Sequence, residues 1–427
     1  MRRKHRTTRR GFLRGVGSAA AAPMLLPASM FGGPTTDGAN DAIGIGLIGC
    51  GSLGVGHHLR AYLPMRDVRI TAVCDVDRTR RESAAREAEK HYKGKFRPGC
   101  YNDFRRLLER KDVDGVIVVT PDHWHALPTI QACQAGKDVH CEKPLSLTIE
   151  EGRAMVTAAR RYNRIVHTGS ESRSKPDIRR ACALVRSGRI GKLYTVRTGL
   201  GDNPTSPWEP DLSPPPGLDW NFWLGPAPEV PYKTRRCFYE FRWFRDYSGG
   251  KLTDWGAHMN DIAQWGMGTD HTGPVHVDAK ARYAPDNMYE FPPWFEVTYT
   301  YGDGVKLITD SGQPHVTFIG SAGTVRTGIR GVESDPPEIA ATPLGANDVH
   351  LRESDNHDRH WLECMRTRRR TVTDVEIGHR SVTVCHLGNI AIWLGRPVEW
   401  DPGKERFVDD PEADRFLSRT MRAPWHL

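Results

Sequence analysis

The nine cysteines of this 427-residue sequence form no C-x-x-C pair, and their spacing matches no zinc-binding motif. They are scattered and odd in number, so we expect free thiols in apolar surroundings and not a disulfide framework. Beyond the N-terminal region no stretch is long and apolar enough to span a bilayer, and no internal repeat is visible. These absences exclude a disulfide scaffold, a multi-span membrane protein and a repeat protein.

The sequence also has little net charge once its first residues are set aside. The formal charge is +8, but seven arginines and lysines and no acid stand among the first 14 residues, which leaves about +1 for the rest. A nearly neutral chain provides no electrostatic attraction to nucleic acid or to an anionic membrane surface. The length of 427 residues suits two domains with a large core.

Residues 8–14 (TRRGFLR) contain two adjacent arginines, Arg9 and Arg10, just ahead of a weakly hydrophobic, alanine-rich stretch. That stretch is interrupted by Pro23 and Pro27 and is too short to span a bilayer. The pattern predicts a signal for the twin-arginine (Tat) translocase, with export of the folded protein to the periplasm. Signal and flexible arm together are expected to occupy residues 1–41. A disordered basic tail and an uncleaved anchor are the alternatives.

An apolar run, Ile43–Ile48, leads into glycines at G-x-G-x-x-G spacing, and a second apolar run, Val68–Cys74, ends at Asp75. This order of strand, glycine turn, helix, strand and acid is that of a dinucleotide-binding βαβ unit. The glycines would allow a tight turn, a close approach of the pyrophosphate and close helix packing, and the helix N-terminus attracts phosphates. An ordinary glycine turn is the alternative. The residues assigned to the turn are Gly49, Gly51, Ser52, Leu53 and Gly54.

Strand-like and helix-like segments alternate as far as residue 168, and the pattern then changes. The alternation predicts an α/β fold with a doubly wound parallel sheet, and thus a Rossmann domain over residues 42–168. After residue 169, segments with period-two character are separated by long loops rich in Pro, Gly and Trp. Residues 169–427 are therefore predicted to form an α+β domain built on a mainly antiparallel sheet.

Three further motifs follow the glycine turn in order: TPDHWH at residues 120–125, EKP at residues 142–144 and GKLTDWGAH at residues 250–258. Together they resemble the Gfo/Idh/MocA family of oxidoreductases, from about residue 43 to the C-terminus. The resemblance implies a nicotinamide cofactor in the first domain, a carbohydrate-like substrate between the domains and a homo-oligomer, either dimer or tetramer. It also implies a cis peptide before Pro144. The motifs specify the family and not the substrate.

The resemblance places the family's catalytic roles on Lys143, Asp254 and His258, which match its E-K-P and D-x-x-x-H patterns. The chemistry agrees, since oxidation of a secondary alcohol needs a base for the hydroxyl proton and a positive group for the developing alkoxide. His258 suits the first role near neutral pH and Lys143 the second, while Asp254 would bond the substrate or tune the histidine. Taken singly, the three are typical of a surface lysine, a helix N-cap and a structural histidine.

Asp75 is expected to bond the adenosine ribose and to favour NAD over NADP, because its charge would repel a 2′-phosphate. Arg78 is also assigned to cofactor binding and complicates this preference, since an arginine just beyond the acid sometimes accepts that phosphate. His57 and His58 are expected on a helix surface. His123 and His125 could suggest a metal site, but two histidines two residues apart at the end of a strand are more typical of a polar turn. No metal is therefore assigned. The cofactor cleft is expected to include Thr120, Pro121, His123, His125, Glu142 and Lys143.

Two aromatic-rich segments, residues 218–226 and 241–247, allow two interpretations. Aromatic rings stack on the apolar faces of sugars while arginine and aspartate bond the hydroxyls, but such segments also pack in cores and oligomer interfaces. An arginine soon after the last strand of the first domain is expected to approach the same cleft. The candidate substrate-binding residues are Arg173, Trp220, Arg242 and Tyr247.

Three functions remain open from the sequence. The first is an NAD(P)-dependent oxidoreductase that acts on a secondary hydroxyl of a sugar, polyol or glycoside and holds its nicotinamide tightly. The second is a glycosidase or lyase that uses NAD transiently through a keto-sugar intermediate. The third is a non-catalytic sugar-binding protein on the same scaffold, which the presence of Lys143, Asp254 and His258 disfavours.

Overall fold

The computed structural model describes residues 42–328 and 331–427, and the predicted export signal in residues 1–41 lies outside this part of the chain. Ile43–Leu427 form one compact unit. Within the described residues no helix is both long and apolar enough to cross a membrane. The nine cysteines are free, and all but Cys100 are buried, so the thiols take part in core packing.

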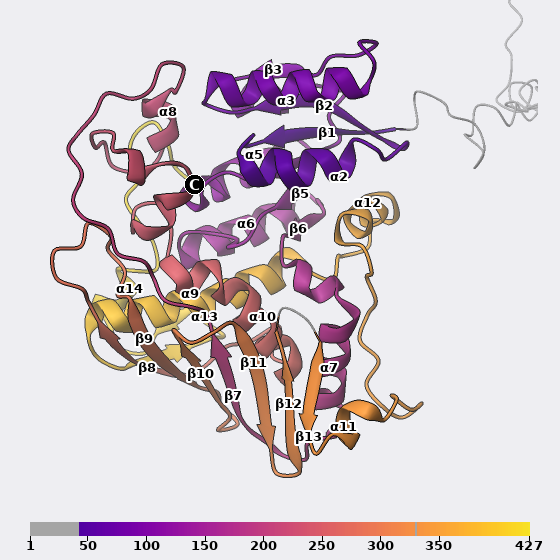
Figure 1. Ribbon diagram of the computed structural model, residues 1–427, viewed down its shortest axis with the longest axis vertical. Helices are drawn as coiled ribbons and strands as arrows, with labels where there is room; N and C mark the ends of the chain where they lie inside the picture. The colour runs from indigo at the N-terminus through magenta and orange to yellow at the C-terminus, as the bar shows by residue number, and fades with distance from the viewer. Residues whose placement is uncertain (1–41, 329–330) are drawn as a thin grey trace, which may run out of the picture. The chain divides into compact units, whose positions relative to one another are not determined.

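The first part of the chain forms a six-stranded sheet with the strand order β3-β2-β1-β4-β5-β6, and every pair of neighbours is parallel (Figure 1). This is the predicted doubly wound sheet. The chain order reverses between β1 and β4, and in such sheets ligands bind at this point, beyond the carboxyl ends of the strands. The strands are β1 (Ile43–Ile48), β2 (Val68–Cys74), β3 (Gly99–Tyr101), β4 (Gly115–Val118), β5 (Asp138–Cys141) and β6 (Val166–Thr168).

The helices of this domain begin where short polar side chains cap them. Asp77, Asp103 and Thr148 each accept a hydrogen bond from a backbone N–H in the first turn of the helix that follows. The segment after the glycine turn is less regular, since a π-helical stretch precedes one short α-helical turn. The elements are η2 (Gly54–Leu59), α2 (Arg60–Tyr62), α3 (Arg78–His91), α4 (Phe104–Leu108), α5 (Ala126–Gln134) and α6 (Ile149–Arg161).

The second sheet has nine strands in the order β13-β12-β11-β7-β10-β9-β8-β14-β15. All neighbours are antiparallel except β7 and β10, so the predicted mainly antiparallel sheet is confirmed. The strands are β7 (Leu193–Gly199), β8 (His276–Arg282), β9 (Trp294–Thr300), β10 (Lys306–Asp310), β11 (His315–Gly320), β12 (Gly323–Thr327), β13 (Val332–Asp335), β14 (Val398–Asp401) and β15 (Arg406–Phe407).

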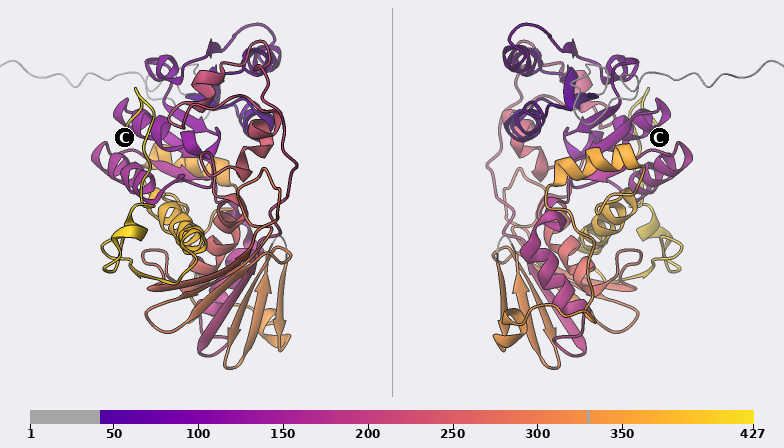
Figure 2. Two further views of the ribbon diagram at one scale, coloured as in Figure 1. Left: turned by 90° about the vertical axis from the view of Figure 1, so that its left-hand side faces the viewer. Right: turned by 90° about the vertical axis from the view of Figure 1, so that its right-hand side faces the viewer.

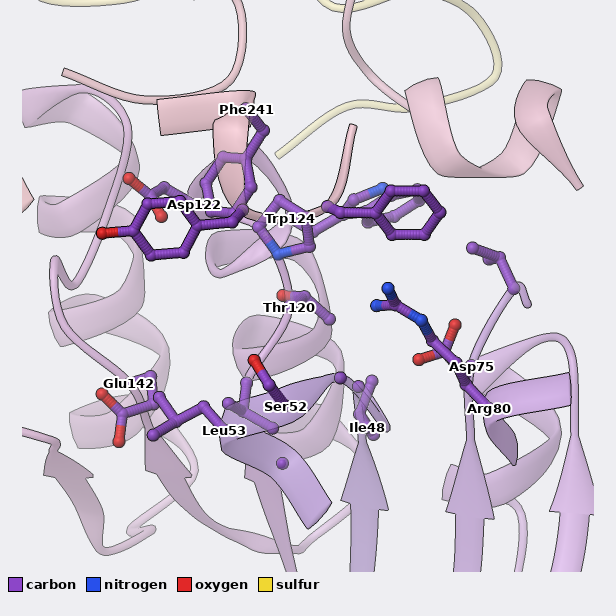
Figure 3. A pocket seen from close by; sticks show the side chains of 18 of the residues that line it. Ile48, Ser52, Leu53, Asp75, Arg80, Thr120, Asp122, Trp124, Glu142 and Phe241 are labelled. Atoms are coloured by element: carbon purple, nitrogen blue, oxygen red, sulfur yellow. The ribbon is translucent and has the colours of Figure 1, made fainter. Parts of the chain in front are cut away.

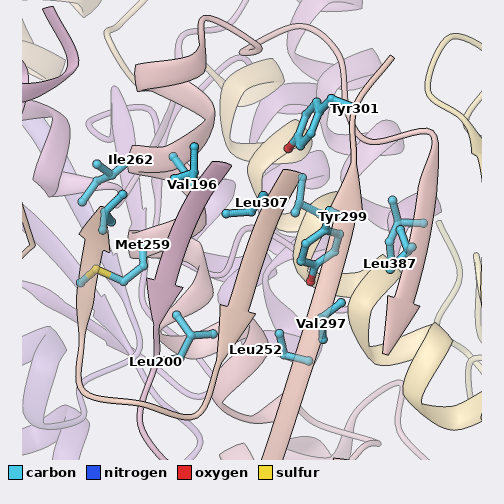
Figure 4. Packing of buried hydrophobic residues seen from close by; sticks show 14 of the residues in the cluster. Val196, Leu200, Leu252, Met259, Ile262, Val297, Tyr299, Tyr301, Leu307 and Leu387 are labelled. Atoms are coloured by element: carbon cyan, nitrogen blue, oxygen red, sulfur yellow. The ribbon is translucent and has the colours of Figure 1, made fainter. Parts of the chain in front are cut away.

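One face of the second sheet is buried under helices. Along β9 the side chains of Phe295, Val297 and Tyr299 are buried and alternate with half-exposed ones, as a strand with one covered face requires. They pack with residues of the helices above the sheet (Figure 4). These helices are α7 (Pro176–Arg186), α10 (Gly256–Met267) and α13 (Val375–Leu394).

The two sheets share a layer of helices. Helix α13 contacts β8 of the second sheet and β6 of the first, and it also packs on α6 (Figure 2). Two late segments return to the first domain. Trp361 of α12 (His357–Thr367) is buried in a core cluster of that domain, and the ring of Trp425 lies 4.8 Å from that of Trp124. The C-terminal part therefore helps to hold the Rossmann domain against the second sheet.

Candidate functional site

A cavity of about 780 Å³ opens at the carboxyl ends of β1, β2, β4 and β5. Asp75 and Arg80 lie at one end of it and Glu142 at the other, with Ser52 and Thr120 between them (Figure 3). This is the point where the strand order reverses. The sequence-predicted cofactor residues that line the cavity are Gly49, Gly51, Ser52, Leu53, Gly54, Asp75, Thr120, Pro121, Glu142 and Lys143.

The reason for glycine differs among the three glycine positions of the turn. Gly49 has φ +102°, which favours glycine, and a Cβ there would stand 2.5 Å from the Val119 carbonyl oxygen. A Cβ at Gly54 would stand 2.1 Å from the Gly49 carbonyl oxygen. At Gly51 a Cβ would meet nothing nearer than the Arg80 guanidinium at 3.4 Å. The protein itself needs glycine at the first two positions, whereas Gly51 leaves its backbone open to the cavity.

The Asp75 carboxylate anchors the turn from the end of β2. It accepts hydrogen bonds from the backbone N–H of Cys50, at 2.7 Å, and of Asp77, at 2.8 Å. Burial raises the pKa of this carboxyl in spite of the two N–H donors. Asp75 also lines the cavity, so the residue that shapes the glycine turn also forms part of the cavity wall.

Arg78 does not line the cavity, which corrects its assignment to cofactor binding. It is the first residue of α3, and its side chain is exposed. Its backbone N–H donates a hydrogen bond to the Gly217 carbonyl. Arg80 lines the cavity instead, with its guanidinium 4.3 Å from the ring centroid of Phe238. Successive residues of an α-helix are rotated by about 100°, so two positions along the helix turn the side chain toward the opposite face.

His123 and His125 also lie behind the cavity wall and not on it. His123 is buried beside Trp223, its Nε2 is 3.0 Å from the Trp223 carbonyl oxygen, and burial lowers its pKa to about 3. His125 has carbonyl oxygens at both ring nitrogens, Pro144 O at 2.7 Å and Thr120 O at 2.9 Å. Only an imidazolium donates to both. Burial opposes the charged form of His125, but Cys141, Asp122 and the Pro144 carbonyl outweigh it and raise its pKa to about 10.

The three predicted catalytic residues meet at the cavity. Lys143 follows β5, Asp254 ends α9 (Gly250–Asp254), and His258 lies in the first turn of α10. Lys143 Nζ is 2.7 Å from Asp254 Oδ1 and 3.1 Å from the Asp254 carbonyl oxygen. Arg242 Nε is 3.4 Å from the same Oδ1. The resemblance also implied a cis peptide at Lys143-Pro144, and it is present.

The charges of this cluster support one another. Burial alone would raise the pKa of Asp254, but Lys143 and Arg242 outweigh it and hold the pKa well below its usual range. In turn Asp254 overcomes the burial of Lys143 and raises the pKa of the ammonium. His258 is partly buried, and burial together with Lys143 lowers its pKa to about 3. In the described part of the chain, its Nδ1 has no hydrogen-bond partner. At neutral pH the cluster therefore holds a cationic lysine beside an uncharged histidine.

Glu142 and His58 form a pair that sequence reasoning missed. Glu142 Oε1 is 2.9 Å from His58 Nε2, and Oε2 accepts the backbone N–H of Lys143 at 3.1 Å. His58 is 1% exposed, so its predicted place on a helix surface is wrong; His57 is exposed as expected. A Cβ at Gly169 would stand 2.7 Å from Glu142 Oε2, so the glycine leaves room for this carboxylate.

Of the four predicted substrate-binding residues, Arg242 alone lines the cavity. Arg173 is 1% exposed and is paired with Asp261 at 2.9 Å and Asp270 at 2.7 Å, so its role is structural. Trp220 stacks on Trp223 with ring centroids 4.7 Å apart, and the fully buried Tyr247 packs edge-on against the same ring. The cavity lining also includes Asp122, Trp124, Trp223 and Phe241, which lie within the motifs and aromatic segments named above, and Tyr239, which no motif marked.

Comparison with known proteins agrees with this arrangement. A family model described as "Oxidoreductase family, NAD-binding Rossmann fold" matches residues 43–170, and one described as "Oxidoreductase family, C-terminal alpha/beta domain" matches residues 208–427. Aldose-aldose oxidoreductase from Caulobacter crescentus, in a crystal structure complexed with glycerol, aligns with a TM-score of 0.63 at 21% identity over 84% of this chain and 99% of that chain. That likeness shows the fold.

Two relatives are similar over shorter stretches. Inositol 2-dehydrogenase 2 of Saccharopolyspora erythraea is 34% identical over 167 residues, 38% of this chain and 47% of that protein. A glycosyl hydrolase family 109 protein of Shewanella putrefaciens is 34% identical over 125 residues, 28% of this chain and 27% of that protein. The chain thus spans less than half the length of either relative. Residues 43–170 form the NAD-binding Rossmann domain, and with the second model over residues 208–427 the chain belongs to the Gfo/Idh/MocA family of oxidoreductases.

Proposed function

We propose that this chain is an NAD-dependent oxidoreductase that moves a hydride between a secondary hydroxyl of a sugar, polyol or glycoside and a tightly held nicotinamide. The observation that carries the proposal is the convergence of Lys143, Asp254 and His258 on the cavity that begins at the glycine turn. A non-catalytic sugar-binding protein would have no need for a buried lysine held by a carboxylate beside an uncharged histidine.

The cavity fits a dinucleotide on structural grounds. At the turn, the open backbone of Gly51 and the N-terminal end of η2 after it suit a pyrophosphate. Asp75 and Arg80 lie at one end of the cavity, where the neighbouring ribose would lie. The opposite end holds Glu142 and Lys143, where the nicotinamide would lie. A bound nicotinamide supplies the acceptor, and on return the donor, of the hydride.

The protein's own residues then divide the remaining work. His258, uncharged at neutral pH, accepts the hydroxyl proton as the carbon loses its hydride. Lys143, kept charged by Asp254, stabilises the negative charge that develops on the alcohol oxygen. Asp254 fixes the direction of the ammonium and thus acts as a positioning residue. Arg242, Trp223 and Phe241 line the same cavity and are suited to hold an oxygen-rich ring by hydrogen bonds and stacking.

A glycosidase or lyase that uses NAD transiently is the second candidate. The similarity to a glycosyl hydrolase family 109 protein favours it, as does the export that we propose below. Outside the cytoplasm a released cofactor would not be replaced, so the hydride must return within the same site. A ketone at C3 of a sugar acidifies the proton at C2, and loss of that proton expels the group at C1, which departs with a proton and leaves a C1–C2 double bond behind it. In a glycosidase water then adds across this double bond before the ketone is reduced again, whereas in a lyase the double bond stays in the product.

Both candidates require a retained cofactor, and mass spectrometry of the purified, denatured protein tests this requirement. We expect about one dinucleotide per chain, predominantly NAD(H). Purified protein that contains none, and that turns over only with stoichiometric free NAD, would instead be an ordinary dehydrogenase.

Incubation of the loaded enzyme with glycosides and no added cofactor separates the two candidates. Repeated release of an aglycone indicates the transient route, whereas a requirement for a second sugar indicates paired oxidation and reduction.

We also propose that the protein is exported in folded form by the Tat translocase to the periplasm. The support is the pair Arg9 and Arg10 ahead of a weakly apolar stretch. Replacement of both by lysine should leave the protein in the cytoplasm, as cell fractionation would show. Unchanged delivery to the periplasm by this variant would refute the proposal.

Assembly into a dimer or tetramer is a further proposal. Helices cover one face of the second sheet, while on the other face the side chains of Trp294, Glu296 and Thr298 in β9 are only half-buried. A broad, partly apolar sheet face of this kind suits the interface of a homo-oligomer. Light scattering coupled to size-exclusion chromatography should give a mass of two or four chains, and a monomer would contradict it.

A further inference from the structure

We infer that His140, His167 and His357 form a binding site for a divalent late transition-metal ion such as Zn²⁺, distinct from the nicotinamide cavity. Each of the three offers a ring nitrogen, and the three nitrogens lie within 4.8 Å of one another. His140 and His167 are 1% and 0% exposed, and His357 is partly buried at the start of α12. None of the three lines the cavity described above.

The sheet register brings the first two histidines together. His140 in β5 and His167 in β6 are direct partners across a parallel strand pair, so their side chains leave the sheet on the same face. Their ring centroids are 4.9 Å apart. Helix α12 adds His357, with its ring centroid 4.0 Å from that of His167 and 5.7 Å from that of His140. Three chain segments that are far apart in sequence therefore supply one ring each.

The hydrogen bonds around His167 determine which of its nitrogens carries the proton. Thr373 Oγ1 donates its single proton to the Thr168 carbonyl at 2.8 Å, because a carbonyl oxygen only accepts. The same Oγ1 lies 2.8 Å from His167 Nδ1 and must therefore accept a proton from it. Nε2 is left as a bare lone pair, and it is buried with no partner among residues 42–328 and 331–427. A buried lone pair of this kind is costly to leave unpaired, and a hydrogen-bond donor or a metal ion would satisfy it.

The other two rings are held in a similar way. His140 Nδ1 faces the Tyr62 hydroxyl at 3.5 Å and Asp358 Oδ1 at 3.9 Å, and its Nε2 is also buried without a partner in the described structure. His357 Nδ1 is 2.9 Å from Ser174 Oγ. Metal-binding histidines are commonly oriented by such an oxygen at the second ring nitrogen.

The third ligand must exchange its present partner for the ion. His357 Nε2 donates its N–H to the Thr168 carbonyl at 3.0 Å, so binding needs the other tautomer, in which Nδ1 carries the proton and donates it to Ser174 Oγ. The Thr168 carbonyl still receives the Thr373 hydroxyl when the ring moves. Zinc–nitrogen bonds of about 2.1 Å place tetrahedral ligand atoms about 3.4 Å apart, so modest ring rotations close the site. Uncharged imidazoles favour zinc, copper or nickel over magnesium or calcium.

The charge of the surroundings suits a cation. Asp358 and Glu142 supply nearby negative charge, and Asp358 Oδ1 has no hydrogen-bond partner within the described residues.

Titration of the untagged, chelator-treated protein with Co²⁺ tests the site, because tetrahedral nitrogen coordination of Co²⁺ gives visible absorption bands. We expect saturation at one equivalent, competition by Zn²⁺, and zinc in the protein as purified. His167→Asn should weaken binding by about 100-fold or more, and Thr373→Val, which removes only the oxygen that orients His167, by about 10–100-fold. His386→Asn is the matched control, since it removes a buried histidine bonded to the Ser146 carbonyl elsewhere in the fold and should leave the titration unchanged.

Two results would overturn the inference. One is a wild-type titration without absorption bands and without retained metal, which would assign the unpartnered nitrogens to ordered water. The other is binding that is lost in His57→Gln but kept in His167→Asn. That result would place the ion at the outer group of His57, His58 and Asp358, whose ligand atoms have comparable spacing. If His167→Asn does not fold, the wild-type protein and Thr373→Val still decide the question.

Discussion

Lys143 Nζ lies 2.7 Å from Asp254 Oδ1, although 111 residues separate the two in sequence. The lysine follows strand β5 of the Rossmann domain, and the aspartate ends helix α9 in the second part of the chain. The salt bridge therefore joins the two parts of the chain where the cavity lies. Because it also fixes the direction of the ammonium, domain association and the proposed chemistry depend on the same contact.

Lys143→Met should keep the dinucleotide and lose turnover. Removal of one group that stabilises charge in the transition state typically costs about 10²–10³-fold in kcat. Steady-state kinetics, with mass spectrometry of the bound dinucleotide, would measure both properties. Lys192→Met is the control, since that lysine is exposed and outside the cavity lining. Nearly normal turnover in Lys143→Met would remove the lysine from the proposed chemistry.

The acid limb of kcat/KM should lie well below the ordinary histidine pKa of about 6.5. His258 acts in its uncharged form, and burial lowers its pKa to about 3, so the base stays available as pH falls through 6 and 5. A pH profile measured between the onset of acid unfolding and pH 8 would test this. An acid limb near pH 6.5 that disappears in His258→Gln would show that the histidine titrates normally.

The protein should bind NAD more tightly than NADP. Asp75 stands at the ribose end of the cavity, where its carboxylate opposes a 2′-phosphate. Titration of cofactor-free protein with both dinucleotides would give the ratio of the two dissociation constants. Arg78→Ala should leave that ratio unchanged because the side chain is exposed, whereas Arg80→Ala should weaken NADP further. Tighter binding of NADP by the wild-type protein would contradict the expectation.

Arg173→Met should reduce stability and not substrate affinity. The arginine is buried between Asp261 and Asp270, and its loss leaves two carboxylates without their partner, at a cost of about 3–5 kcal/mol. Arg197→Met removes a partly exposed pair with Asp310 and should cost only about 1 kcal/mol. Urea unfolding would compare the two variants. A raised KM with unchanged stability in Arg173→Met would return the arginine to substrate binding.

The sequence predicted the elements that have strong periodicity or a local signal. The apolar runs Ile43–Ile48 and Val68–Cys74 are strands β1 and β2 with the same bounds, because a strand that is buried on both faces is marked by a continuous apolar run. Strands β12 and β13, the last two at one end of the second sheet, were not predicted. They are short, and β13 alternates half-exposed and exposed residues, so burial leaves little pattern in their sequence.

Site residues were predictable where a motif fixes the backbone that carries them. The glycine turn, Lys143, Asp254 and His258 all line the cavity. Arg78, His123 and Arg173 do not, because helix rotation, a buried ring pocket and a pair of aspartates decide where each side chain points. The histidine cluster has no motif at all. Its members come from segments far apart in sequence, and only strand register and the return of α12 bring them together.

The central claim is that the cavity carries out hydride transfer to a dinucleotide that stays bound, and one measurement tests it most directly. Purified protein with its retained dinucleotide is mixed with a panel of polyols, aldoses and glycosides, without free cofactor, and quenched by denaturation. Mass spectrometry then gives the ratio of oxidised to reduced dinucleotide. We predict that at least one compound changes this ratio by up to one equivalent per chain in the wild-type protein, and much more slowly in Lys143→Met. A ratio that no compound changes, although the sugars bind, would contradict the account.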